Sequence, residues 1–329
     1  ISCADKQESK TNYADLTKQY AKVQLTSDIS HLSDNEKQML NYLYEVGNIM
    51  DDIFWTQQFG GDKGTFLNSI KDKDARLFAE INYGPWNHFD GLASFLPEYG
   101  EMPVGAGFYP ADMTKEEFEA WDDPNKTSLY TLIKRDENGK LQSVWYHEAY
   151  AEQIQKAADL LLKAADLAGD KEFADYLRLR SKALLTDEYF ESDMAWMDVR
   201  NNNVDFVVGP IENYVDALYG YKAAHEAFIL IKDHAWSKQL AHYAELLPEL
   251  QTQLPVAPEY KAEKPGADAD LAVYDAVFYG GDCNMAGKTI AINLPNDEQV
   301  QLQKGTRKLQ LKNAMKAKFD NILVPISDV

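Results

Sequence analysis

The stretch from Val204 to Asp216 reads VDFVVGPIENYVD. Its first part alternates in hydrophobicity, with Val204, Phe206 and Val208 on one side, which predicts a β-strand. Polar side chains follow, and the chain from Ala217 to Leu250 is then expected to be helical. Polar residues at the junction of a strand and a helix are well placed to contact a ligand.

Helices are predicted on both sides of this strand. The first runs from Leu16 to about Asp52, with a capping-box pair of Ser33 and Glu36 inside it. A second is expected over residues 65–80, and apolar spacing over residues 148–186 indicates a helical hairpin with its turn at 169–170.

Short strands complete the pattern. Leu129–Lys134 and Leu141–Tyr146 flank Asn138-Gly139, a dipeptide that tolerates the positive φ angles of a tight hairpin turn. Three further strand-like pieces are expected at residues 272–279, 288–293 and 308–311. Because strands and helices are interspersed without regular alternation, the predicted class is α+β, mostly helical with a small mixed β-sheet.

The charge balance excludes several classes of partner. The 329 residues include 33 Lys and Arg against 53 Asp and Glu, a formal net charge of −20. Nucleic-acid binding needs a basic surface that displaces counterions, so we expect no nucleic-acid partner. A polybasic contact with an anionic membrane is excluded for the same reason. The sequence also lacks a run of about 18 apolar residues, so no spanning helix is predicted.

The N-terminus indicates a second kind of membrane contact. Cys3 follows small residues and precedes a polar stretch, which resembles the processing site of a bacterial lipoprotein. This predicts lipid attachment at Cys3 and a place in the bacterial cell envelope, in the periplasm or on the outer membrane. The alternative is an ordinary polar tail on a cytoplasmic protein.

The histidines do not form a zinc motif. His147-Glu148 and His225-Glu226 each supply the first half of a His-Glu-x-x-His pattern, but Ala151 and Ile229 stand where the second His is needed. Both are interpreted as ordinary helix histidines, and no metal site is predicted in this chain. The acids between Asp187 and Asp198 are interpreted as a solvated face.

Two polar segments carry the candidate site. One is the Glu212–Asp216 stretch of the opening sequence, and the other is Asn293-Leu294-Pro295-Asn296. An asparagine side chain offers both a donor and an acceptor, which suits contact with an extended peptide backbone.

These two segments resemble signatures of the dipeptidyl peptidase III family of zinc exopeptidases. Glu212–Asp216 is similar to the family's Glu-x-Tyr-x-Asp pattern, and Asn293–Asn296 to its Asn-x-Pro-Asn pattern. The stretches at residues 105–114 and 220–224 are similar to the bacterial branch. The resemblance covers about residues 35–325, in the family's order.

The resemblance implies an enzyme that releases dipeptides from the free N-terminus of oligopeptides, in a cleft between two lobes. Tyr214 would then donate to the developing oxyanion as the catalytic residue. Asn293 and Asn296 would bind the substrate main chain, Glu212 would recognise the α-ammonium, and Asp216 would also contact substrate. Val215 and Ala217 depart from many relatives, which have an Arg and a Pro around the Tyr motif.

The family's zinc ligands follow the Asn-x-Pro-Asn segment at a distance, and Val329 precedes where they are expected. The resemblance therefore implies zinc in a longer parent protein, a missing C-terminal zinc domain, and no activity in this chain alone. The chain would be the N-terminal lobe, which holds a small β-barrel. The expected parts are a tether (1–15), an α+β lobe (16–215), a helical segment toward the zinc lobe (216–270) and a β-rich return (271–329).

A competing hypothesis is a non-catalytic periplasmic lipoprotein that captures peptides or glycans. It is based on the lipid attachment predicted at Cys3 and on the aromatic stretch from Tyr83 to Tyr99.

Overall fold

The structure is a computed structural model that describes residues 11–261 and 270–327. Cys3, the predicted lipid-attachment residue, and most of the tether lie outside the described residues. The lipid attachment and the predicted division into domains therefore stay predictions.

The helices and strands are interspersed along the chain, as expected for the α+β class. The helices are α1 (Tyr13–Thr17), α2 (Asp34–Phe59), α3 (Lys63–Ser69), α4 (Lys73–Asn82), α5 (Lys115–Ala120), α6 (Tyr146–Ala149), α7 (Ala151–Ala165), α8 (Lys171–Thr186), α9 (Phe190–Trp196), α10 (His234–Ala244), α11 (Leu247–Gln253), α12 (Pro258–Lys261), α13 (Glu298–Lys304), α14 (Lys312–Lys318) and α15 (Val324–Ser327). The strands are β1 (Trp86–Asn87), β2 (Ala93–Ser94), β3 (Thr131–Arg135), β4 (Leu141–Trp145), β5 (Val204–Glu212), β6 (Ala224–Lys232), β7 (Asp270–Gly281), β8 (Ala291–Leu294) and β9 (Arg307–Leu311).

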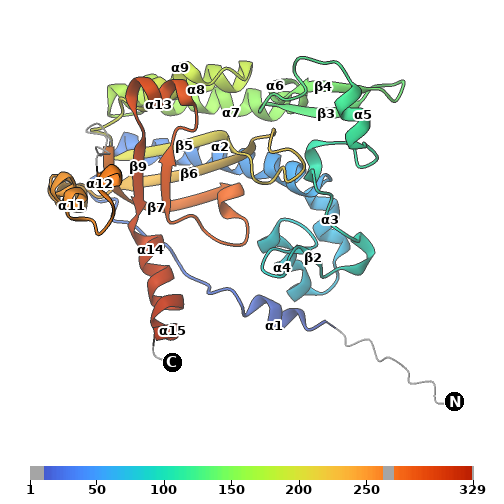
Figure 1. Cartoon of the computed structure of the whole chain (residues 1–329), viewed down its shortest axis with the longest axis horizontal. Helices are drawn as coiled ribbons and strands as arrows, with labels where there is room; N and C mark the ends of the chain where they lie inside the picture. The colour runs from blue at the N-terminus through green and yellow to red at the C-terminus, as the bar shows by residue number, and fades with distance from the viewer. Residues whose placement is uncertain (1–10, 262–269, 328–329) are drawn as a thin grey trace.

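The main sheet has five strands in the order β5-β6-β7-β9-β8 (Figure 1). It is mixed, because β7 and β9 pair in parallel while the other neighbours are antiparallel. The sheet curls so that its two ends approach each other: the side-chain amide of Asn296, just after β8, donates to the carbonyl of Ile211 on β5 at 3.2 Å. The predicted small mixed sheet is confirmed.

Helix α2 covers one face of this sheet and packs on β6 and β7. It begins at the predicted capping box, since the Ser33 side chain accepts from the backbone N–H of Glu36 and the Glu36 side chain accepts from that of Ser33. It ends at Gly60, whose φ of +80° is a left-handed conformation that costs glycine nothing.

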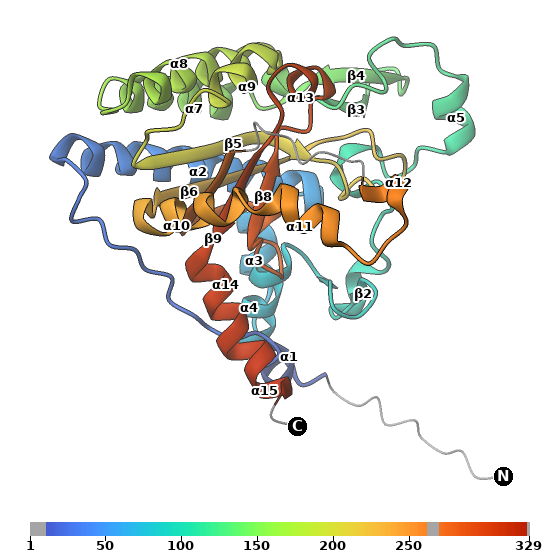
Figure 2. The same ribbon diagram turned by 60° about the vertical axis from the view of Figure 1, so that its left-hand side comes forward.

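A second helical layer lies over α2. The hairpin of α7 and α8, predicted from apolar spacing, packs on α2 through α7, and α9 packs on α8 (Figure 1). On the other side of the sheet α10 packs on β7, and Figure 2 shows α14 leaving the sheet from the end of β9. The helices that pack on the sheet thus come both from before it in the chain, as α2 does, and from between its strands, as α10 does.

The hairpin and the late strands occur where they were predicted. β3 and β4 pair in register around a turn in which Gly139 has a φ of +76°. β7, β8 and β9 correspond to the three strand-like pieces near the C-terminus.

Two predicted helices are wrong in extent. The helix expected from Leu16 is limited to α1 and α2, because the chain between them is not helical and Ser33 caps a new start. The helix expected over residues 65–80 is two helices, since Asp72 accepts from the N–H groups of Asp74 and Ala75 and so begins α4.

The largest error concerns the segment 217–250, which was predicted to be helical. It contains β6, a central strand that pairs with both β5 and β7 and is buried along its whole length. A strand buried on both faces has a continuous apolar sequence, which hydrophobic periodicity cannot distinguish from a buried helix. His225 therefore lies on a strand and is not a helix histidine.

Among the described residues, no helix combines the length and apolar character needed to cross a bilayer.

Candidate functional site

Three of the predicted site residues line one hollow at the end of the curled sheet. Glu212 ends β5, Tyr214 follows it, and Asn293 lies on β8, and all three border a cavity of about 180 Å³. The tyrosine is 68% exposed, so its ring stands at the mouth of the hollow. The curl of the sheet brings together residues that are about 80 positions apart in the chain.

Two acids that the sequence analysis did not select complete this hollow. Glu226 comes from β6, and Asp282 comes from the short 3-10 turn Asp282–Asn284 after β7. Burial, followed by the charges of Asp282 and Glu212, raises the pKa of Glu226 well above its ordinary value. Burial and then the charge of Glu212 raise the pKa of Asp282 to about 7. We call Glu212, Glu226 and Asp282 the acid pocket.

The acid pocket brings like charges together. Burial is the largest cause that raises both pKa values and the neighbouring carboxyls follow, while hydrogen bonds with Cys283 lower the pKa of Glu226 in part. Carboxyls in such a group share protons and titrate as a unit. The pocket is therefore an electrostatic site for a cation, in particular one that can donate several hydrogen bonds.

The hydroxyl of Tyr214 faces the same acids. Partial burial, then a hydrogen bond with Glu212 and the charges of Glu226 and Asp282, raise the pKa of Tyr214. The hydroxyl therefore keeps its proton at neutral pH and remains a hydrogen-bond donor.

Strand β8 presents a free edge beside the acid pocket. It pairs with β9 on one side, and no other described strand pairs with it. Its side chains alternate: Ala291 and Asn293 are exposed, while Ile292 and Leu294 are buried. An extended peptide could add to this edge, with its backbone hydrogen bonds parallel to those of the sheet.

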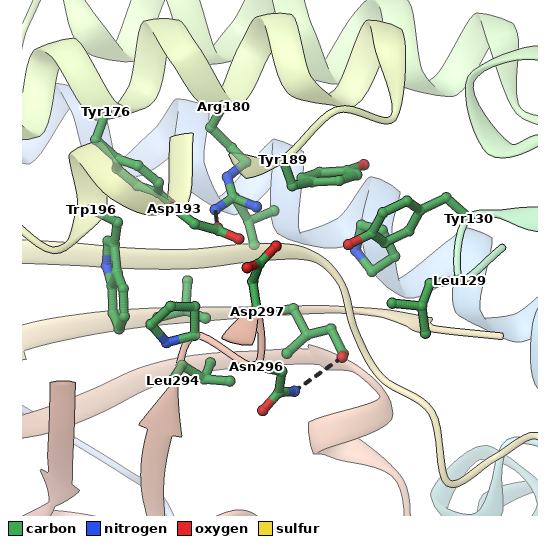
Figure 3. A pocket seen from close by; sticks show the side chains of 15 residues that line it. Leu129, Tyr130, Tyr176, Arg180, Tyr189, Asp193, Trp196, Leu294, Asn296 and Asp297 are labelled. Atoms are coloured by element: carbon green, nitrogen blue, oxygen red, sulfur yellow. Dashed lines mark hydrogen bonds and ion pairs between the residues drawn. The ribbon is translucent and has the colours of Figure 1, made fainter. Parts of the chain in front are cut away.

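Asn296 connects the two predicted motifs. Its side-chain amide donates to the Glu212 carboxylate at 3.1 Å, as well as to the Ile211 carbonyl. It also borders a second hollow, of about 120 Å³, that Figure 3 shows between the sheet and α8 and α9. There Arg180 lies between the rings of Tyr176 and Tyr189 and pairs with Asp193.

This second hollow corrects the interpretation of a solvated face for Asp187 and Asp193, whereas Glu188, Glu191 and Asp198 are exposed as that interpretation expected. The Asp193 side chain is only 18% exposed beside Arg180, and Asp187 is 5% exposed and accepts from His147 at 2.8 Å. Their partners Arg180 and His147 come from other helices, so sequence spacing alone did not indicate them.

The structure does not bring Asp216 to the acid pocket. Its carboxylate accepts from the hydroxyl of Tyr109 at 2.7 Å and from four backbone N–H groups in the turn at residues 218–222. With 2% of its surface exposed, it holds this turn in place. Its predicted contact with substrate has no geometric support here.

An apolar hollow adjoins the acid pocket. It has a volume of about 300 Å³ and shares Tyr214 and Asp282 with the cavity that holds the acid pocket. Its other lining side chains are mainly apolar, such as Leu92, Met102 and Val104. A ligand whose cationic group lay in the acid pocket could place an apolar side chain here.

The residues that the structure describes do not fit a metal. They contain no group of three or more His, Cys, Asp or Glu side chains that could hold an ion. We therefore derive no chemical step through a metal from this chain.

Comparison with known proteins identifies the family. The model of peptidase family M49 matches residues 120–326, which include both predicted motifs and the acid pocket. The chain belongs to peptidase family M49, the dipeptidyl peptidase III family.

Two solved M49 structures share the fold. Dipeptidyl peptidase III from Caldithrix abyssi superposes with a TM-score of 0.88 at 38% identity, covering 94% of this chain and 61% of that one. The enzyme from Corallococcus sp. strain EGB gives a TM-score of 0.86 at 34% identity, covering 96% and 61%. The fold is thus that of a dipeptidyl peptidase III lobe.

Among curated proteins, this M49 chain is similar to Nudix hydrolase 3 from Arabidopsis thaliana, with 31% identity over 94% of the chain and 48% of that protein. It is also similar to dipeptidyl peptidase 3 from Nematostella vectensis, with 24% identity over 76% of the chain and 31% of that protein. The chain spans about half or less of the length of these curated relatives.

Proposed function

We propose that this chain is the substrate-binding part of a zinc-dependent dipeptidyl peptidase that releases dipeptides from the free N-terminus of oligopeptides. One observation carries the proposal: the acid pocket lies directly beside the free edge of β8. A peptide could therefore place its α-ammonium among carboxyls while its backbone pairs with a strand.

The α-ammonium suits the acid pocket in charge and in hydrogen bonding. It carries three N–H donors and one positive charge, and Glu212, Glu226 and Asp282 all line the cavity and supply acceptors there. Its charge would lower the pKa values that burial and crowding raise, so we expect peptide binding to release protons from the pocket. A peptide with a blocked N-terminus lacks this interaction.

The rest of the site orients the peptide. Asn293, exposed at the edge of β8, can donate to and accept from a main-chain amide. The protonated hydroxyl of Tyr214 can donate to a carbonyl oxygen near the peptide's amino end, and such a bond strengthens when negative charge develops on that oxygen. The apolar hollow would take the side chain nearest the ammonium.

The zinc belongs to the proposed parent and not to the described residues. We infer that its ligands lie in another part of a longer protein, in line with the share of the relatives that this chain spans. On this proposal the 329-residue chain binds peptides but releases no dipeptides on its own. We retain the proposal of a lipid-anchored protein of the bacterial cell envelope on the sequence around Cys3.

The decisive experiment is calorimetry of the chain with tetra-alanine and with N-acetyl-tetra-alanine. We expect the free peptide to bind at least about tenfold more tightly, because a charge-assisted hydrogen bond contributes about 1.5–3 kcal/mol. Repeating the titration in buffers of different ionisation enthalpy measures proton release.

Two variants localise the effect. Glu212→Gln should remove most of the preference for the free N-terminus, whereas Glu298→Gln, an exposed acid outside the pocket, removes the same charge and should leave it intact. Equal affinity for the two peptides would overturn the proposal. Binding of oligosaccharides in place of peptides would instead support the competing hypothesis of a non-catalytic lipoprotein that captures glycans.

A further inference from the structure

The turn that carries Asp282 is held in place from both ends. It follows Gly281, which has a φ of +76° and lies so close to β6 that a Cβ atom would come within 2.2 Å of the His225 carbonyl. Beyond the turn, the backbone N–H of Ala286 donates to the carbonyl of Ile81 at the end of α4, at 2.9 Å. Asp282 therefore projects from a short segment whose backbone is pinned to other elements.

One carboxylate on α2 accounts for much of this restraint. Asp51 accepts from the backbone N–H of Gly281 at 2.9 Å and from the hydroxyl of Tyr83. The hydroxyl of Tyr83 in turn accepts from the side-chain amide of Asn284 at 2.7 Å. Asp51 thus reaches the start of the turn directly and its end through Tyr83.

The environment of Asp51 makes these bonds strong. Its side chain is only 16% exposed, and Lys63 donates to it at 3.1 Å, so it is an anion paired with a cation. Burial and then the charge and hydrogen bond of Asp51 raise the pKa of Tyr83 well above its usual range, so Tyr83 remains a donor. Hydrogen bonds to a partly buried anion are shorter and stronger than neutral ones.

We propose that Asp51 is a positioning residue for the acid pocket: by accepting from Gly281 and Tyr83 it fixes the turn that presents Asp282 to a bound α-ammonium. The inference rests on the proposed function for its consequence in binding. It goes beyond that proposal because Asp51 lies on α2 and borders neither hollow beside Tyr214.

A neighbouring residue provides a matched control. Asp52 also accepts from Lys63, at 2.8 Å, but it is 56% exposed and forms no hydrogen bond with the described residues of the turn. Asp51→Asn and Asp52→Asn each remove one carboxylate charge beside Lys63 on the same helix. Only the first removes the anion that accepts from the backbone N–H of Gly281 and the hydroxyl of Tyr83.

The test compares these two variants with the unmodified chain in three measurements. We expect Asp51→Asn to speed hydrogen exchange of the amides of residues 281–284 at least about tenfold and to shift the carboxyl NMR signal of Asp282, assigned by its loss in Asp282→Asn. We also expect it to reduce the affinity ratio of tetra-alanine to N-acetyl-tetra-alanine about tenfold, whereas Asp52→Asn leaves all three measurements unchanged.

The outcomes separate this inference from the proposed function. If Asp51→Asn matches Asp52→Asn in exchange and in the Asp282 signal, the positioning role is wrong, whatever the peptides do. If the unmodified chain does not distinguish the two peptides, the proposed function fails, and the exchange and NMR comparison alone decides whether Asp51 positions Asp282. Should Asp51→Asn not fold, Tyr83→Phe removes the second arm of the same network, and we expect exchange in residues 281–284 to rise about threefold.

Discussion

The acid pocket and the interior of the curled sheet both bury carboxyl groups, but the two regions differ in the partners that these groups have. Inside the curl, Asp205 on β5 and Arg307 on β9 are both completely buried and pair at 2.8 Å. Asp205 also accepts from the Trp196 indole at 2.9 Å, and the guanidinium of Arg307 lies 4.2 Å from the centre of that ring. In the acid pocket, Glu226 and Asp282 have raised pKa values and each other as neighbours.

This difference separates structural charges from charges that await a ligand. The charges of Asp205 and Arg307 compensate each other within the chain, and the pair connects strands that are not neighbours in the sheet. In the acid pocket the carboxyls lie together without an ion-pair partner among the described residues, so binding of a cation would lower the free energy of the chain. Sites that bind or react commonly carry such uncompensated groups at a cost in stability.

The largest expected effect comes from breaking the paired region. Asp205→Ala leaves Arg307 buried without its carboxylate, and we expect the free energy of unfolding to fall by about 3–5 kcal/mol. Urea denaturation measures this change. Asp175→Ala, which removes exposed pairs with Lys171 and Arg178, should cost far less. A loss below about 1 kcal/mol for Asp205→Ala would show that the two regions do not differ as described.

Removing a carboxyl from the acid pocket should raise the free energy of unfolding instead of lowering it. In the folded chain the pKa values of Glu226 and Asp282 lie above their unfolded values of about 4.3 and 3.9, so the folded state binds more protons in between. The free energy of unfolding should therefore fall as the pH rises from about 4 to beyond 7. At pH 8, Glu226→Gln should stabilise the chain, with less effect at pH 5. A variant less stable than the unmodified chain at pH 8 would contradict this account.

The smallest effect on stability is expected when the acid pocket is given its own cation. Ala291 is an exposed residue of β8 that borders the pocket, so Ala291→Lys can place an ammonium among the acids. We expect a gain of up to about 1 kcal/mol at pH 8, and a loss of the preference for a free peptide N-terminus. Ala291→Gln has similar length without charge and serves as the control. If the lysine variant still prefers the free N-terminus, the ammonium does not bind in this pocket.

Local sequence signals predicted much of the fold. The capping box at Ser33, the Asn-Gly turn of the β3–β4 hairpin and the apolar spacing of α7 and α8 all depend on residues close in the chain, and the structure has each of them. β6 was missed because its central residues 227–231 are apolar on both faces, which only the flanking β5 and β7 explain.

The candidate site was predicted only in part. Glu212, Tyr214 and Asn293 were selected from short motifs and do meet at one cavity. Glu226 and Asp282 were not selected, because one was assigned to a helix and the other lies in a turn without a motif. Asp216 was selected with the Tyr motif, yet its carboxylate accepts from the backbone of its own turn.

The sequence by itself therefore determined the fold class, the main helices and the two motifs, because each of these depends on residues that are close together in the chain. Its net charge of −20 also predicts that the chain has no nucleic-acid partner, which stays a prediction. Only the tertiary structure decided which acids are paired and which are gathered into a pocket. That choice depends on the curl of the sheet, which brings β5, β6 and β8 together across long stretches of chain, and charge interactions depend on distance in space.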